Sequence, residues 1–437
     1  MSVAKKYLSI QPNNVPSTGR ISAARGNPII TITLGRQDAM LDMSSIRLSG
    51  DLNIWRDAAG TLHPTNTDAA ELMGSHKLGI YSVIDQVVWR HAETKQIVEH
   101  VRNYGRFMSS YLPVLSSSND TSGHLSESAL IYPNYQAFRD SVIRNTRASP
   151  FCIPLPTGVT MGTGSLPLSK LPLELEIHLS SDSQVFYSSD GTTGNINNAF
   201  YELSNLELTC EVEYDVPVSN QGVFSFNSLT SYFTTLESTN SIINFNLGLS
   251  KVLGCFVNFV PSNFINNLAQ DGFLTYMPTK APNAVGTGNG GIANLLTLSF
   301  LRNGERFPKA FEIDTNYDDA TNQTTVVDPQ VIKSFLSSII PENMHTRTTA
   351  SPLNTNRNFT GNQNATTGYR FIPDSGGCYG VGVLMDMLDS QGVDFSNAQF
   401  SIQMTNELDD QNPISAYLFI KSKVVVAWSD SGVEVIN

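Results

Sequence analysis

The sequence contains few charged residues. They make up 15% of the 437 residues, well below the roughly one quarter that is usual for globular proteins. Serine, threonine, asparagine and glutamine must therefore supply most of the polar surface. Such a surface can form wide protein contacts at a low cost of charge desolvation. This composition is typical of β-rich assembly proteins.

Cysteine is scarce and long apolar runs are absent. The four cysteines are far apart and form no C-x-x-C pair, which predicts free thiols in a protein made in a reducing compartment. No run of about 18 apolar residues would span a membrane. Residues 1–10 lack the apolar core of a signal peptide, so we expect synthesis without one.

The patterns that mark catalytic and metal sites are also missing. None of the seven histidines forms an i, i+4 or H-x-H pair, and no serine lies in a G-x-S-x-G motif. Residues 286–291 match G-x-G-x-x-G, but prolines precede them and an alternating strand pattern follows, which indicates a loop. We therefore predict no catalytic residue, no metal site, no cofactor and no small-molecule substrate.

Positive charge is scarce overall but gathers at the N-terminus. The net charge is −12, which argues against a nucleic-acid-binding body. Residues 1–36 nevertheless contain five basic residues and no acidic one. We expect residues 1–26 to form an extended basic arm, in which Lys5, Lys6, Arg20 and Arg25 could contact an anionic inner surface such as lipid headgroups or a genome. The alternative is a frayed terminus with solvated charges.

The strongest positive signal is alternation of apolar and polar residues with a period of two. It runs through 173–179 and 206–214, and the chain closes on a strand at 417–428. Alternation of this kind predicts strands with one buried and one wet face. Roughly sixteen such segments with few helices predict an all-β fold of antiparallel sandwiches with short helices and long surface loops. We place the boundary between two β modules after Pro217, giving 1–217 and 218–437.

Several local patterns make further predictions. Residues 79–89 are apolar and β-branched, which predicts a buried strand, and 103–112 could form a short helix. Asn303-Gly304 between apolar runs predicts a type I′ hairpin turn, because both residues tolerate positive φ. Asp328-Pro329 predicts the start of a helix that ends near 340.

The chain resembles the double jelly-roll major capsid proteins of polinton-like viruses, adintoviruses, virophages and large eukaryotic DNA viruses. The resemblance covers nearly the whole chain and is a pattern without a signature motif. The segments that carry it are 79–84 (GIYSVI), 87–89 (VVW), 97–99 (IVE), 103–104 (NY), 298–304 (LSFLRNG), 306–308 (RFP), 394–397 (DFSN) and 415–418 (SAYL).

The resemblance implies two tandem eight-stranded jelly rolls in each chain. It implies a homotrimer that forms a pseudo-hexameric capsomer, with capsomers tiling an icosahedral virion shell, often over a membrane. Neighbouring capsomers and minor capsid and penton proteins are the implied partners, and no enzymatic residue is carried over. The loops expected to form outward towers are 56–76, 113–130, 180–197, 278–291, 314–327 and 342–370.

Two other classes of protein remain open from the residues alone. A carbohydrate-binding or spike-like β-sandwich protein would need an aromatic platform, for which Tyr111, Tyr132, Tyr135 and Tyr187 are the candidates. An enzyme on a cupin-like double sandwich would need two or more histidines and a carboxylate on inward strand positions. The sequence does not show that spacing.

Overall fold

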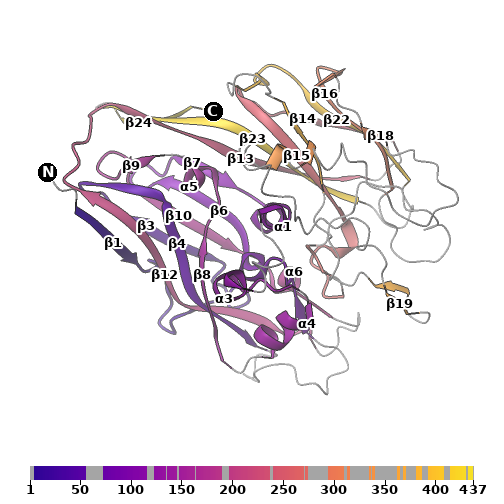
Figure 1. Cartoon of the computed structure of the whole chain (residues 1–437), viewed down its shortest axis with the longest axis horizontal. Coiled ribbons are helices and arrows are strands. Elements are labelled where there is room, and N and C mark those ends of the chain that lie inside the picture. The colour runs from indigo at the N-terminus through magenta and orange to yellow at the C-terminus, as the bar shows by residue number, and fades with distance from the viewer. Residues whose placement is uncertain are drawn as a thin grey trace.

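The computed structural model describes most of the chain, and Figure 1 shows two β-rich halves, coloured indigo to magenta and salmon to yellow. The described residues are 4–55, 72–115, 123–133, 135–144, 147–162, 164–188, 196–236, 240–269, 271–273, 294–309, 313–314, 334–335, 337–339, 362–364, 368–370, 380–385, 392–407, 414–429 and 432–436.

Two antiparallel sheets form the N-terminal sandwich. One sheet has the order β1-β12-β4-β8, with β2 beside β12 and β9 beside β4, and the other has the order β3-β10-β6-β7. Their strands are β1 (Ala4–Ile10), β2 (Arg20–Ile21), β3 (Ile29–Leu34), β4 (Ala39–Trp55), β6 (Ile84–His91), β7 (Ile97–Val101), β8 (Ser149–Pro154), β9 (Ser165–Pro167), β10 (Leu173–Leu179) and β12 (Phe200–Tyr214).

Two further antiparallel sheets form the C-terminal sandwich. The first, here called the junction sheet, has the order β13-β23-β15-β21 with β24 beside β23, and the second has the order β14-β22-β16-β17 with β18 beside β16. Their strands are β13 (Gly222–Leu236), β14 (Asn240–Phe245), β15 (Val252–Pro261), β16 (Asn294–Arg302), β17 (Glu305–Arg306), β18 (Ile313–Asp314), β21 (Val381–Leu384), β22 (Phe400–Glu407), β23 (Ile414–Ser429) and β24 (Gly432–Ile436).

Short helices and two small strand pairs complete the described elements. The strand pairs are β5 (Leu72–Gly74) with β11 (Phe186–Ser188) and β19 (Asn362–Asn364) with β20 (Gly368–Arg370). The helices are η1 (Gly79–Val83), α1 (Tyr104–Leu115), α3 (His124–Ala129), α4 (Tyr135–Phe138), η2 (Arg139–Ile143), α5 (Gly158–Met161), α6 (Asp182–Val185) and η3 (Ser262–Phe264).

Alternating side chains build the core of the N-terminal sandwich. On β10, Leu173, Leu175 and Ile177 are fully buried, while Glu176 and His178 point to the other face. The partner strands β3 and β6 bring Ile32 and Val87 to the same core. The period of two in the sequence therefore corresponds to one buried and one polar sheet face, as predicted.

The junction sheet is covered on both faces. Residues Cys255, Val257 and Phe259 of β15 face the core of the C-terminal sandwich. Their neighbours Phe256 and Val260 belong instead to the hydrophobic cluster of the N-terminal sandwich. A strand that is buried on both faces has an almost continuous apolar sequence. This explains why residues 252–257 contain no polar side chain.

Most sequence predictions of local structure agree with the fold. Asn303 and Gly304 have φ of 52° and 80°, and they connect β16 to β17 where Arg302 pairs with Glu305, so the hairpin prediction is confirmed. The helix predicted at 103–112 is α1. The strand predicted across 79–89 is partly wrong, because residues Gly79–Val83 form the 3-10 helix η1 and β6 begins at Ile84.

The predicted long loops have a mixed outcome. Loop 113–130 contains α3, and loop 180–197 contains α6 and β11. Residues 56–71, 278–291, 315–327 and 342–361 lie outside the described residues, as do Asp328 and Pro329 of the predicted helix start. In the part of the chain that the structure describes, no helix is long and apolar enough to cross a membrane.

Candidate assembly surfaces and the junction between the sandwiches

The two lysines of the predicted basic arm lie on an edge strand. Residues Ala4–Ile10 form β1, which pairs with β12 along its length. Lys5 Nζ lies 3.0 Å from Glu213 Oε1, and Lys6 lies over the ring of Tyr214, 5.1 Å from its centre. The hydrogen bond and charge of Glu213 raise the pKa of Lys5. An exposed pair of this kind contributes little to stability.

The two arginines of the predicted arm converge on one buried carboxylate. Arg20 and Arg25 approach Glu202 at 3.4 Å and 3.1 Å, and the Glu202 side chain has no exposed surface. The two guanidinium groups also lie over the rings of Trp55 and Phe200, respectively. Since a buried carboxylate requires charged partners, both arginines have a role inside the fold.

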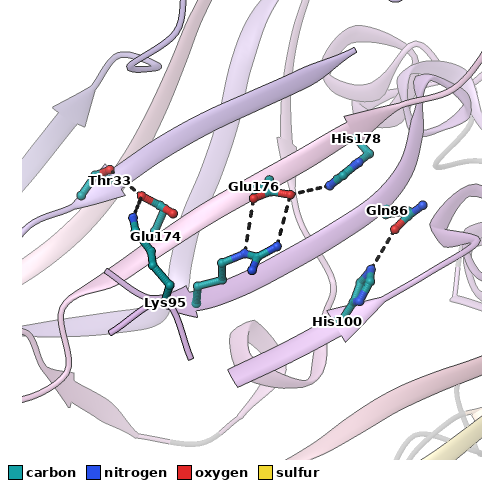
Figure 2. A network of polar contacts seen from close by, with 8 residues as sticks. Thr33, Gln86, Lys95, His100, Glu174, Glu176 and His178 are labelled. Carbon is teal, nitrogen blue, oxygen red and sulfur yellow. Dashed lines mark hydrogen bonds and ion pairs between the residues drawn. The ribbon is translucent and has the colours of Figure 1, made fainter. Parts of the chain in front are cut away.

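A polar network covers the outward face of the sheet β3-β10-β6-β7 (Figure 2). Lys95 Nζ lies 2.6 Å from Glu174 Oε2. Glu176 contacts Arg90 at 3.3 Å and His178 at 2.6 Å. We call these five side chains the polar sheet face. Because its acids and bases pair with each other, this face can meet another protein without leaving a charge unpartnered.

His100 lies at the edge of the polar sheet face. Its Nε2 is 2.8 Å from Gln86 Oε1, as Figure 2 shows. Burial, reinforced by the charge of Arg102, lowers the pKa of His100 to about 4. The neutral imidazole is therefore the form that the folded protein prefers.

We expect acidification to destabilise the protein through His100. In the pH window between 6.5 and about 4, the unfolded chain binds a proton at this histidine and the folded chain does not. Stability should fall as pH is lowered through this window, and His100→Gln should remove that part of the loss. Thermal unfolding of the wild type and His100→Gln at pH 7 and pH 5 measures this loss of stability. An identical decrease in the two proteins would contradict the role of His100.

A buried glutamate joins the two sandwiches. Glu99 of β7 is 2% exposed. Its Oε1 accepts hydrogen bonds from Gly158 N at 3.0 Å and Leu229 N at 3.3 Å, and its Oε2 accepts one from Val159 N at 2.9 Å. Leu229 lies on β13 of the C-terminal sandwich. Burial raises the pKa of Glu99, and the backbone N–H donors oppose that shift.

Beside Glu99, the backbone of α5 lies very close to the backbone of β13. Gly158 begins α5, and a Cβ atom at this position would overlap the carbonyl oxygen of Asn227 on β13. The side chain of Thr157 caps the helix and also accepts a hydrogen bond from Trp89 Nε1 at 3.1 Å. Only glycine allows α5 to lie this close to the edge of the junction sheet.

Aromatic side chains make the apolar part of the same junction. Phe107 of α1 lies 6.4 Å from Phe256 and 6.1 Å from Phe419, measured between ring centres. Beside them, Asn258 Nδ2 donates a hydrogen bond to Ser110 Oγ at 2.7 Å. Figure 1 shows α1 between the two halves of the molecule. The sandwiches are therefore packed together through a buried interface.

Comparison with known proteins finds a likeness in structure only. The sequence matches no protein-family model and no curated protein. Among solved structures, PBCV-1 VP54 fitted into a reconstruction of the virophage Sputnik has a TM-score of 0.57 at 10% identity, covering 100% of this chain and 98% of that one. A Sputnik virophage chain has a TM-score of 0.58 at 11% identity (99% and 88% covered), and the Faustovirus major capsid protein has 0.52 at 9% identity (98% and 91% covered).

The chain has the double jelly-roll fold of viral major capsid proteins. Both sandwiches take part in the match, because the alignments cover the whole chain. The fold predicted from the sequence resemblance is confirmed. With about a tenth of the residues identical, the likeness shows the fold, and the function has to be argued separately.

The double jelly roll holds the predicted contact residues at its surface and not in a free arm. Residues Ala4–Ile10 are a strand of the sheet, and Arg20 begins the short strand β2. The structure brings Arg20 and Arg25 together on Glu202, while Lys5 and Lys6 lie along β1. Contact of Lys5, Lys6, Arg20 and Arg25 with an anionic inner surface stays a prediction.

The aromatic candidates for a carbohydrate platform do not form one together. Tyr187 is 6% exposed, and Tyr111 stacks on Phe107 with ring centres 5.0 Å apart. Tyr132 packs edge-on against Phe138. Nothing is described for the side chain of Tyr135. The described tyrosines serve packing, so this observation does not favour the carbohydrate-binding alternative.

Two residues that hold the junction, Glu99 and Gly158, were not predicted from the sequence. The sequence carries no clear signal for Glu99, and the break in the alternation of β7 at this position appears only in the burial of its side chains. Val98 and Glu99 are both buried although they are adjacent on the strand. A charged residue that is buried out of phase usually has a specific partner.

Proposed function

We propose that this protein is a major capsid protein of a DNA virus and that its role is structural, without catalysis. The full-length match of both sandwiches to viral major capsid proteins is the observation that carries the proposal. Its site of action is the virion. The low content of charged residues, 15%, suits a protein whose outer surfaces become contacts.

The proposed assembly unit is a homotrimer. Each chain would supply two lobes, 1–217 and 218–437, so three chains would form a pseudo-hexameric capsomer that tiles an icosahedral shell. The buried junction supports this geometry, because a lattice requires the two lobes of a chain to keep one relative orientation. Further partners in this proposal are neighbouring capsomers, minor capsid and penton proteins, and a membrane or genome that Lys5, Lys6, Arg20 and Arg25 would contact.

The oligomeric state tests the assembly proposal. At micromolar concentration, size-exclusion chromatography with light scattering should give about 143 kDa, three times the 47.7 kDa chain. Electron microscopy of the expressed protein should show six-lobed particles or closed shells. A stable 47.7 kDa monomer that forms no particles at higher concentration would count against the capsid role.

A further inference from the structure

A polar pocket of about 310 Å³ opens at the junction of the two sandwiches. The N-terminal sandwich contributes residues from the start of β6, from α1 and from the end of β10. The C-terminal sandwich contributes residues that follow η3 and one residue of β23. The polar residues that line it include Asp85, Arg106, Ser181, Gln184, Asn266 and Tyr417.

Arg106 is a buried cation on the wall of this pocket. It is 4% exposed, and its guanidinium carbon lies 4.8 Å from the ring centre of Tyr417 and 5.3 Å from that of Phe273. Within the described part of the chain, neither Nη1 nor Nη2 makes a hydrogen bond of good geometry, and the polar groups that act most strongly on the guanidinium are the Tyr417 side chain and the buried Asp271 carboxylate. Burial lowers the pKa of Arg106, while Tyr417 and Asp271 raise it. The guanidinium keeps its charge.

A second donor on the same wall also lacks a partner. Gln184 Oε1 accepts a hydrogen bond from Asn266 N at 3.3 Å. Gln184 Nε2, on the opposite side of the amide, therefore points away from Asn266 N. Gln184 Nε2 is buried and has no hydrogen-bond partner among the described residues. A buried donor without an acceptor is costly, and more so for a charged group. Arg106 Nη1 and Nη2 and Gln184 Nε2 thus offer N–H groups for which the described residues supply no well-placed acceptor.

We propose that the junction pocket binds a small oxyanion, whose oxygens accept hydrogen bonds from the Arg106 guanidinium and the Gln184 amide. Guanidinium and amide donors are the groups that commonly hold phosphate-like ligands. Two carboxylates near Arg106 oppose a negative ligand, Asp85 on the pocket wall and the buried Asp271. Burial raises the pKa of Asp271, which weakens its opposition. Asp85 Oδ2 accepts a hydrogen bond from Gln86 Nε2 at 3.1 Å, and this carboxylate limits the affinity. The site goes beyond the capsid role and does not depend on it.

The experiment uses the full chain and inorganic phosphate as the probe. Isothermal titration calorimetry and thermal unfolding are measured in phosphate and in chloride at equal ionic strength. The wild type should bind phosphate and unfold at a higher temperature in its presence. Arg106→Gln should lose this response, whereas Arg36→Gln, an exposed arginine outside the pocket, should keep it.

The Asp85→Asn variant makes the test independent of how well the Arg106 variant folds. Removing the carboxylate from the pocket wall should tighten phosphate binding roughly 3- to 10-fold, because a like charge is removed from a partly buried site. The proposal is overturned if the wild type shows no phosphate-specific binding, if Arg106→Gln responds like the wild type, or if Asp85→Asn binds phosphate more weakly. None of these outcomes bears on the trimer, which light scattering tests separately.

Discussion

Replacing Glu99 with alanine is expected to lower the free energy of unfolding by about 3–5 kcal/mol. The substitution removes the acceptor of three backbone N–H groups, those of Gly158, Val159 and Leu229. Each buried donor that loses its partner costs about 1–3 kcal/mol. The pocket beside Glu99, of about 400 Å³, lets water reach part of the gap, which keeps the total below the sum of three separate losses.

Urea unfolding monitored by fluorescence measures this effect. Glu93→Ala is the matched control, because 51% of the Glu93 side chain is accessible and its partner Arg36 is still more exposed, at 60%. The loss of stability in this variant should stay below about 1 kcal/mol. Glu99→Gln should fall between the two, since the amide retains one acceptor oxygen but points N–H groups at backbone donors. Equal stability of Glu99→Ala and Glu93→Ala would show that this carboxylate does not hold the junction.

The sequence predicted the strands whose burial follows a simple period. On β10 and on residues 206–212 of β12, every second side chain enters one core, so the alternation in the sequence and the two faces of the strand coincide. β13, a strand of 15 residues, was not predicted. Its alternation is interrupted at Leu229, because Ser228 and Leu229 are both buried where the strand meets the N-terminal sandwich. This interruption is set by tertiary contacts and cannot be inferred from local pattern.

The same reason explains why the junction residues were not predicted. In the sequence, Glu99 follows Val98 on a short strand and looks like an ordinary exposed acid. Its partner Leu229 comes 130 residues later. Arg106 belongs to a helix that was predicted correctly, but the rings that cover it, Phe273 and Tyr417, come from the other half of the chain. In this protein the local sequence pattern predicts most strands and helices. The residues that meet at the junction are determined by long-range packing.

Replacing Phe107 with alanine is expected to cost about 3–5 kcal/mol and to weaken the coupling of the two sandwiches. Phe107 is 2% exposed and contacts rings from both parts of the molecule, Tyr111 on its own helix and Phe256 and Phe419 on the junction sheet. The cavity left by the missing ring would lie between the sandwiches and not inside either one. We therefore expect the unfolding transition to broaden or to separate into two steps.

Phe233→Ala is the matched control for this prediction, because the same ring is removed from a side chain that is 53% exposed on β13; its loss should be about 1 kcal/mol or less. Unfolding is followed by differential scanning calorimetry.

A double-mutant cycle of Phe107→Ala with Phe419→Ala should give a coupling energy of about 0.5–1.5 kcal/mol. If the two losses are simply additive and the transition stays single, other contacts such as Glu99 hold the sandwiches at a fixed angle. A measurable coupling energy would show that this aromatic contact between α1 and the junction sheet helps to fix the orientation of the two sandwiches. The proposed capsid lattice requires such a fixed orientation.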